Sequence, residues 1–227
     1  MKIDYSACFV TDGVGLRERI ESAREEYNPV CESYFGEILS RRKEAFCESA
    51  CGFLLLDGLF VKNGINRAEL IIAHDEKNRP LVYDDSIDFS VSHSEGCAFC
   101  VLALAENGEK AQVGCDVQYA RDYSPEKMAE LARAFMNEKE LSAFENASDK
   151  TAAFFGLWTR REAYIKRAGL DIFGSFKDAD MSDGAFSGGV IHASGRHYYY
   201  NISVPSEYNK PKENNPLEND TENLVGK

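Results

Sequence analysis

The sequence predicts an α+β protein made of two successive α+β halves. Strand and helix patterns run in the order strand, helix, strands before residue 106, and in the order strand, helices, strands after residue 111. The polar stretch ENGEKA at 106–111 separates the two series. A hydrophobic fraction of 44% in 227 residues is enough for a sizeable core. We therefore expect an N-terminal half over 1–106 and a C-terminal half over 107–206. The two halves show no clear sequence repeat.

The N-terminal half begins with alternating residues that predict a strand, and apolar residues at helical spacing follow. Valine- and isoleucine-rich runs bounded by turn residues then predict further strands. The expected elements are a strand at 2–10, helices at 15–27 and 37–62, a strand at 68–76, a turn at 77–80, and two strands within 88–107 around the turn SEG.

The C-terminal half opens with a strand pattern at 112–120, and helical patterns then dominate. Ser124 and Asn137 are expected N-caps, Pro125 suits a first helical position, and Gly169 suits a helix end. The expected elements are helices at 124–136, 137–146 and 148–169 and a hairpin at 188–204. The polar, proline-containing tail at 207–227 cannot bury enough apolar surface to fold alone, so we expect it to be disordered.

Composition excludes several classes of protein. A net charge of −12 argues against non-specific nucleic-acid binding. No apolar run is long enough to cross a bilayer, and the N-terminus lacks a signal-peptide pattern, so we expect no membrane association and a cytoplasmic location. Seven cysteines, mostly among apolar neighbours, fit reduced core thiols, and the pair in CAFC at 97–100 is expected in a core strand.

The stretch DFSVSHSEG at 88–96 ends a predicted strand with hydroxyls, an imidazole and a glycine turn. Alternation puts Ser90, Ser92 and Ser94 on one face and His93 on the other. This mixture of donors suits an anion such as a phosphate. A polar strand end without a ligand is an equal alternative. A serine hydrolase is disfavoured, because the chain lacks the G-x-S-x-G motif.

The stretch VGCDVQ at 113–118 places Asp116 and Gln118 on one strand face beside Gly114, which permits a close approach. Two oxygen donors form part of a site for Mg²⁺, which prefers oxygen ligands and substrate phosphates. On this stretch alone, a solvated outer face explains the same pattern.

The helix at 148–169 carries Trp158, Glu162 and Lys166 on one stripe, at i, i+4 and i+8. The glutamate could face a metal while the lysine holds a phosphate, since the large aromatic residues nearby favour partial burial. The alternative is an ordinary surface Glu–Lys pair.

These three motifs, in this order, resemble those of the Sfp-type 4′-phosphopantetheinyl transferases. The family patterns are a strand ending in S-H-S, then G-[IV]-D-[IV]-E, then W-[ST]-x-[KR]-E-[AS]-x-x-K-x-x-G. The last is matched by Trp158, Thr159, Arg161, Glu162, Ala163, Lys166 and Gly169. The resemblance runs from about residue 35 to 204. It implies two similar α+β halves related by a pseudo-twofold axis, with the active site in the cleft between them.

The resemblance also assigns roles to residues. It implies Asp116 and Glu162 as magnesium ligands, with Gln118 as a weak third ligand where the family usually has glutamate. It implies that His93 and Lys166 contact the coenzyme A phosphates. The remaining coenzyme-binding residues that it implies are Ser92 and Arg79, and also Ser49 with Arg42 or Lys43 near the nucleotide 3′-phosphate. Glu48 stands where a basic residue is expected.

The function expected from this resemblance is Mg²⁺-dependent transfer of 4′-phosphopantetheine from coenzyme A to a serine of an apo carrier protein, releasing 3′,5′-ADP. Asp116, Glu162 and Lys166 would be the catalytic residues. The partners would be coenzyme A and an acyl, peptidyl or polyketide carrier, and the protein would be a monomer. One alternative is a non-catalytic coenzyme A- or nucleotide-binding module, which only Gln118 favours. A Mg²⁺-dependent phosphohydrolase is a second.

Overall fold

The computed structural model describes residues 1–227 except 11–13, 78, 107, 171–175, 178 and 209–227. The described residues form six α-helices and three small sheets, so the predicted mixture of helices and strands is confirmed. They divide into two compact units, one spanning Met1–Val113 and the other beginning at Gly114. The division at 106/107 and the pseudo-twofold relation stay predictions. None of the described helices is long and apolar enough to cross a membrane.

The first unit contains an antiparallel sheet of three strands. β1 (Lys2–Phe9), β5 (Cys97–Leu104) and β4 (Ile87–Ser94) lie in that order. Glu95 and Gly96, both with positive φ, form the tight turn between β4 and β5. Cys97 and Cys100 are completely buried in β5 and form no disulfide, which confirms the CAFC stretch as core strand.

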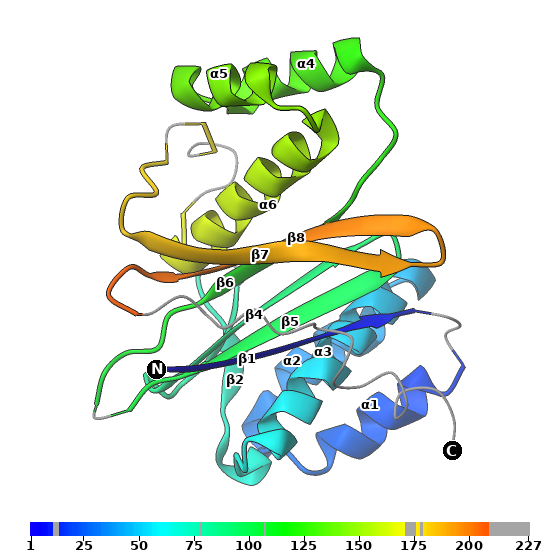
Figure 1. Cartoon of the computed structure of the whole chain (residues 1–227). Coiled ribbons are helices and arrows are strands. Elements are labelled where there is room, and N and C mark those ends of the chain that lie inside the picture. The colour runs from blue at the N-terminus through cyan, green and yellow to red at the C-terminus, as the bar shows by residue number, and fades with distance from the viewer. Residues whose placement is uncertain (11–13, 78, 107, 171–175, 178, 209–227) are drawn as a thin grey trace. The chain divides into compact units, whose positions relative to one another are not determined.

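Three helices of the first unit pack together with this sheet: α1 (Leu16–Arg24), α2 (Glu32–Ser40) and α3 (Lys43–Lys62). α3 lies along one face of the sheet (Figure 1). At Gly52 of α3, an added Cβ would lie 2.6 Å from Val91 of β4, so the glycine permits the close approach. The face of β4 that carries Phe89 and Val91 is therefore the face that meets α3.

The prediction of a single helix at 37–62 is wrong, because α2 ends at Ser40 and a new helix, α3, begins at Lys43. Arg41 and Arg42 have extended backbones, with ψ of 152° and 159°. The run SRRK contains no apolar residue to bury, so it turns the chain between two helices that each bury an apolar face. The break also places Arg41, rather than Arg42, against Ser49.

The strand expected at 68–76 is shorter in the structure. Residues Arg67–Glu69 form a 3₁₀ turn capped by Asn66, and only β2 (Ile72–His74) is extended. β2 pairs with β3 (Pro80–Val82), so the KNRP segment lies between the strands of a small hairpin.

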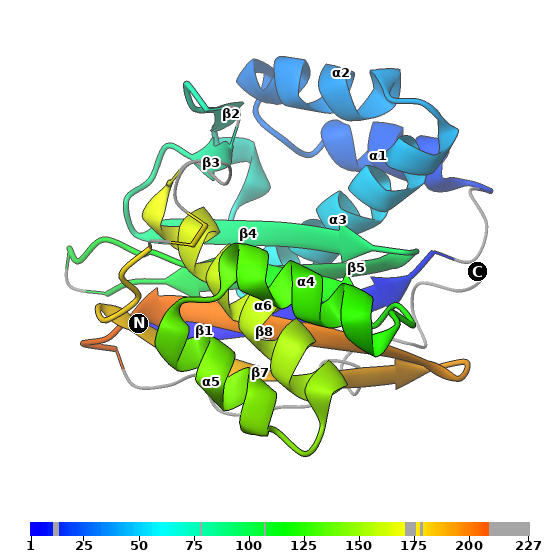
Figure 2. The ribbon, with the colours of Figure 1, turned by 90° about the horizontal axis from the view of Figure 1, so that it is seen from above.

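The second unit is built on an antiparallel sheet in which β6 (Gly114–Tyr119), β8 (Arg196–Pro205) and β7 (Gly184–Ala193) lie in that order. Helix α6 (Lys150–Ala168) crosses one face of this sheet (Figure 2). At Gly114, an added Cβ would lie 2.1 Å from the Ala163 carbonyl oxygen and 2.5 Å from the Arg167 nitrogen. Only glycine permits this contact, which brings α6 directly onto the start of β6.

Helices α4 (Pro125–Phe135) and α5 (Glu138–Asn146) cover the outer side of α6. Their predicted caps are confirmed: the Ser124 side chain accepts from the Lys127 N–H, and Asn137 forms a capping box with Glu140. Gly169 ends α6 with a φ of 61°, as its sequence position indicated. Most of the tail expected to be disordered, at 207–227, lies outside the described residues.

Candidate active site

Asp116 lies on the face of β6 that meets α6. Side chains alternate along a strand, so Asp116 shares its face with Gly114, whose backbone touches α6. Asp116 is only 2% exposed. The interpretation of this stretch as a solvated outer face is therefore wrong for Asp116.

Glu162 and Lys166 lie one turn apart on α6 and converge on Asp116. The Lys166 Nζ donates to the Asp116 Oδ1 at 2.7 Å and lies 3.9 Å from the Glu162 Oε2. The side chains of Glu162 and Lys166 are only 19% and 24% exposed, which contradicts an ordinary surface pair. Two carboxylates thus share one largely buried ammonium group.

Burial and charge change the protonation of this cluster. Burial, assisted by the neighbouring Asp116 carboxylate, raises the pKa of Glu162 to about 7, while Lys166 opposes the rise. For Lys166, burial lowers the pKa, but the attraction of Asp116 and Glu162 outweighs it, and the pKa is raised. Glu162 therefore exchanges a proton near neutral pH, as a general base must.

Trp158 precedes Glu162 by one turn and belongs to an aromatic cluster. Its ring centroid lies 5.1 Å from that of Phe135 and 4.9 Å from that of Phe176. Large aromatic residues therefore pack around Trp158, one turn before Glu162, as the sequence indicated.

Arg161 has a structural role in α6 that the sequence did not indicate. It is completely buried, pairs with Glu140 of α5, and donates to the Phe176 carbonyl at 2.7 Å. It thereby ties α5 and the segment at Phe176 to α6.

The cluster provides oxygen donors of the kind that Mg²⁺ prefers. Asp116 and Glu162 lie close enough to share one positive group, so their carboxylates fit a common cation. Gln118 follows Asp116 on the same face of β6 and is half-buried. No group of three or more His, Cys, Asp or Glu side chains gathers among the described residues, so a third oxygen donor would be an amide or water.

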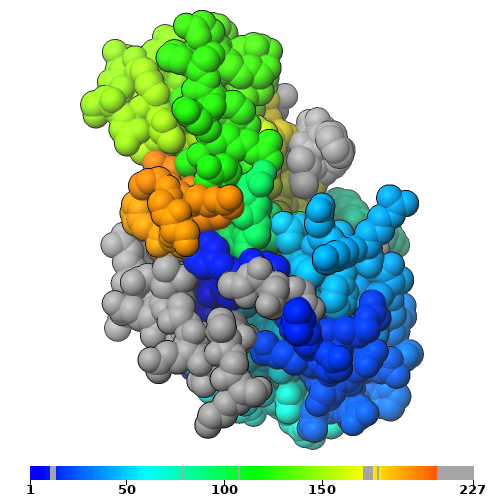
Figure 3. Space-filling model, turned by 90° about the vertical axis from the view of Figure 1, so that its right-hand side faces the viewer, coloured from blue at the N-terminus to red at the C-terminus, as the bar shows by residue number. Residues whose placement is uncertain are grey.

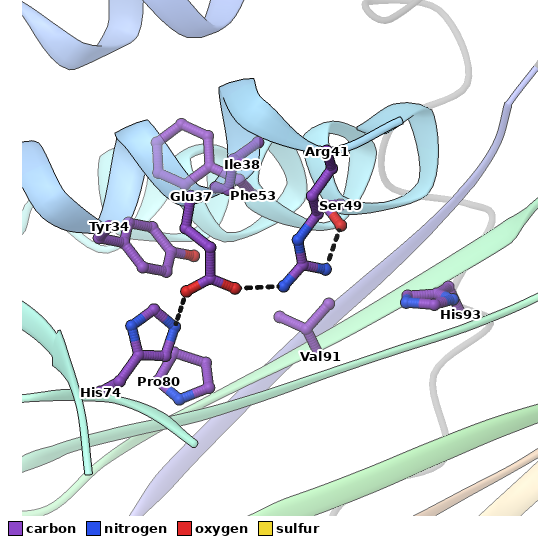
Figure 4. A pocket seen from close by; sticks show the side chains of 10 residues that line it. All are labelled: Tyr34, Glu37, Ile38, Arg41, Ser49, Phe53, His74, Pro80, Val91 and His93. Atoms are coloured by element: carbon purple, nitrogen blue, oxygen red, sulfur yellow. Dashed lines mark hydrogen bonds and ion pairs between the residues drawn. The ribbon is translucent and has the colours of Figure 1, made fainter. Parts of the chain in front are cut away.

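The first unit holds a separate pocket of about 170 Å³, lined by α2, α3, β4 and the β2–β3 hairpin. Figure 4 shows the chain of contacts in it. The Arg41 guanidinium donates to the Ser49 Oγ at 2.7 Å and pairs with Glu37, whose other oxygen lies 3.3 Å from the His74 Nε2. The pocket is lined by Tyr34, Glu37, Ile38, Arg41, Ser49, Phe53, His74, Pro80, Val91 and His93.

Of the residues expected to bind the coenzyme, Ser49 and His93 line this pocket. Ser92, Arg79 and Arg42 do not line it. Arg42 is exposed at the N-cap of α3, and Arg41 instead contacts Ser49. His93 is half-exposed, with its Nδ1 3.0 Å from the Glu48 Oε2. Ser92 is buried on the opposite face of β4.

Arg79 is already engaged within the first unit. Its Nη2 contacts both oxygens of Asp88, at 2.8 and 3.0 Å, and donates to the Val113 carbonyl at 3.2 Å. Asp88 in turn accepts from the Val113 N–H at 2.8 Å. The arginine thus fixes the end of the first unit, a role that its sequence neighbourhood did not reveal.

The sheet, its crossing helix and the buried acid–lysine cluster define a mixed α/β protein with two carboxylates and a lysine gathered on one face of β6. Residues 112–212 match the model of the 4′-phosphopantetheinyl transferase superfamily, which confirms the resemblance found in the sequence. This segment includes Asp116, Gln118, Glu162 and Lys166, and so contains the whole acid–lysine cluster.

Curated relatives carry the same description. A putative 4′-phosphopantetheinyl transferase of Haemophilus influenzae is 32% identical over 120 residues, which is 52% of this chain and 49% of that protein. The 4′-phosphopantetheinyl transferase HetI of Nostoc is 27% identical over 47% of this chain and 44% of its own length. The L-aminoadipate-semialdehyde dehydrogenase-phosphopantetheinyl transferase of Saccharomyces cerevisiae is 27% identical over 56% of this chain and 47% of its own length. The chain spans about half the length of these relatives.

Proposed function

We propose that this protein transfers the 4′-phosphopantetheine group of coenzyme A to a serine of an apo carrier protein, with Mg²⁺ as cofactor. The observation that carries the proposal is the convergence of Asp116 and Glu162 on Lys166 within the matched segment. The names of the relatives support the same reaction class.

In this reaction, the carrier serine oxygen attacks the β-phosphorus of coenzyme A. The bond from that phosphorus to the bridging oxygen breaks, and 3′,5′-ADP leaves. Glu162 accepts the serine proton, and its pKa of about 7 without a bound metal ion leaves it partly ionised near neutral pH. Lys166 compensates negative charge on the leaving phosphate, and Asp116 orients Lys166 through their 2.7 Å contact.

Asp116 and Glu162 would hold the Mg²⁺, with Gln118 as a neutral third oxygen donor. When bound, the ion would neutralise and polarise the pyrophosphate. The contacts of Lys166 with both carboxylates support this proposal, because they place a positive group beside the same two acids.

The pocket of the first unit supports coenzyme recognition. Arg41 with Ser49 supplies a cation and a hydroxyl for an anionic group, and we assign to them the nucleotide 3′-phosphate expected near Ser49. His93, at the edge of the same pocket, would contact a phosphate of the coenzyme. Ser92, Arg79 and Arg42 do not line this pocket, so we place them second among the candidates for binding the coenzyme.

The test is a carrier-loading assay read by intact-protein mass spectrometry. The protein is mixed with coenzyme A, MgCl₂ and an apo carrier, and the carrier should gain one phosphopantetheine group. Asp116→Ala should abolish transfer while circular dichroism remains unchanged. Glu130→Ala, at an exposed glutamate of α4, is the matched control and should transfer normally. Transfer at the wild-type rate by Asp116→Ala would refute the role of the acid–lysine cluster.

The same assay separates the alternatives. Coenzyme A binding by calorimetry without any carrier mass gain would identify a non-catalytic coenzyme A-binding module, the class that the neutral Gln118 favours. Release of phosphate from coenzyme A without a carrier would identify a phosphohydrolase. We further propose that the protein acts as a cytoplasmic monomer, which sedimentation and cell fractionation test.

A further inference from the structure

Two of the four histidines in the chain face each other near the tip of the β7–β8 hairpin. His192 of β7 is directly opposite His197 of β8 in the strand register. Their ring centroids lie 4.7 Å apart, with an interplanar angle of 86°. Neither residue has a part in the proposed transfer reaction.

The register explains why the rings lie so close. Ser194 and Gly195 both have positive φ, 50° and 75°, and form a two-residue hairpin turn. The pair next to such a turn, Ala193 and Arg196, is hydrogen-bonded, so the following pair, His192 and His197, is not. The His197 carbonyl accordingly accepts from the Ala120 N–H at 2.9 Å, on the side away from β7. Side chains are closest in non-hydrogen-bonded pairs.

The surroundings leave both imidazoles accessible. His192 and His197 are exposed, and the hairpin tip, drawn in orange, lies at the surface in Figure 3. Arg196 projects from the other face of β8, where its guanidinium lies 5.5 Å from the centre of the Tyr119 ring. Its positive charge is therefore directed away from the imidazole pair.

We propose that His192 and His197 form a binding site for a borderline divalent transition metal ion, Zn²⁺ or Ni²⁺, with water in the remaining positions. Imidazole nitrogen is a preferred ligand of these ions. Among the described residues, no third His, Cys, Asp or Glu joins the pair, so the protein supplies two ligands. The site is distinct from the acid–lysine cluster, whose oxygen donors suit Mg²⁺. A bound ion would tie β7 to β8 at the open end of the sheet.

The test is a ZnCl₂ titration of the full chain, followed by long-range ¹H–¹⁵N spectra of the histidine rings. With four histidines, each signal can be assigned from one variant. The signals of His192 and His197 should shift together to a one-to-one endpoint, and those of His74 and His93 should not follow them. MgCl₂ should leave the pair unchanged.

The variants measure chelation directly. His192→Gln should weaken Zn²⁺ binding to His197 about tenfold or more. The loss is expected because an ion bound to His197 meets the imidazole of His192 at a high effective concentration. His197→Asn should do the same at His192, and His74→Gln should leave the affinity unchanged. Unchanged affinity in His192→Gln, or a shift of only one ring of the pair, would overturn the proposal. These readouts do not depend on transferase activity.

Discussion

Replacing Glu162 by glutamine should change how stability depends on pH. In the folded protein, burial and Asp116 hold the pKa of Glu162 near 7, against an ordinary value of 4.5. The folded state therefore binds this proton more tightly than the unfolded state. The resulting stabilisation is fully present below pH 4.5 and is lost as pH rises to about 7. Glutamine mimics the neutral carboxyl group at every pH.

The size of the effect follows from the pKa. Each pH unit between the two values corresponds to about 1.36 kcal/mol, so ionising Glu162 costs the folded state about 3 kcal/mol in total. Glu162→Gln and the wild type should therefore unfold with similar free energies near pH 4.5. By pH 8, the variant should be more stable by about 2–3 kcal/mol. Magnesium would oppose this difference by stabilising the ionised form.

The assay is urea unfolding in EDTA buffers from pH 4.5 to 8, followed by tryptophan fluorescence. Trp158 is the only tryptophan in the sequence and lies one turn from Glu162 in α6. Its fluorescence therefore reports the unfolding of the second unit. Glu130→Gln, at an exposed glutamate of α4, provides the control and should show a difference that stays constant with pH. A constant difference between Glu162→Gln and the wild type over this range would refute the argument that Glu162 is buried beside a second carboxylate.

Three further outcomes are expected. Gln118→Glu should tighten Mg²⁺ binding about tenfold by adding a charge worth about 1.4 kcal/mol, measured by calorimetry; weaker binding would exclude residue 118 from the site. Gly114→Ala should destabilise the protein by about 3 kcal/mol in urea unfolding, because the new methyl group would meet the Ala163 carbonyl. Gly156→Ala, where an added Cβ has open space, is the control and should be neutral or slightly stabilising. Arg41→Met should weaken coenzyme A binding about tenfold but leave binding of the analogue without the 3′-phosphate unchanged; equal loss for both would place that phosphate elsewhere.

The sequence alone determined the local elements that carry the site. Strand alternation put Asp116 on the same face as Gly114, and helical spacing put Trp158, Glu162 and Lys166 on one stripe. Caps and terminators were also readable, because their hydrogen bonds are made within a few residues. These are short-range properties of the backbone, so one sequence is sufficient to predict them.

Only the tertiary structure decided what covers each face. Periodicity groups residues by face, but packing determines whether water or α6 lies over Asp116, and hence the pKa of Glu162. The end of α2 at Ser40, within the range where one helix was expected, placed Arg41 rather than Arg42 against Ser49. Arg79 pairs with Asp88 of β4 and also donates to the Val113 carbonyl, 34 residues further along the chain. Burial and long-range pairing depend on segments brought together only by the fold, and no local pattern encodes them.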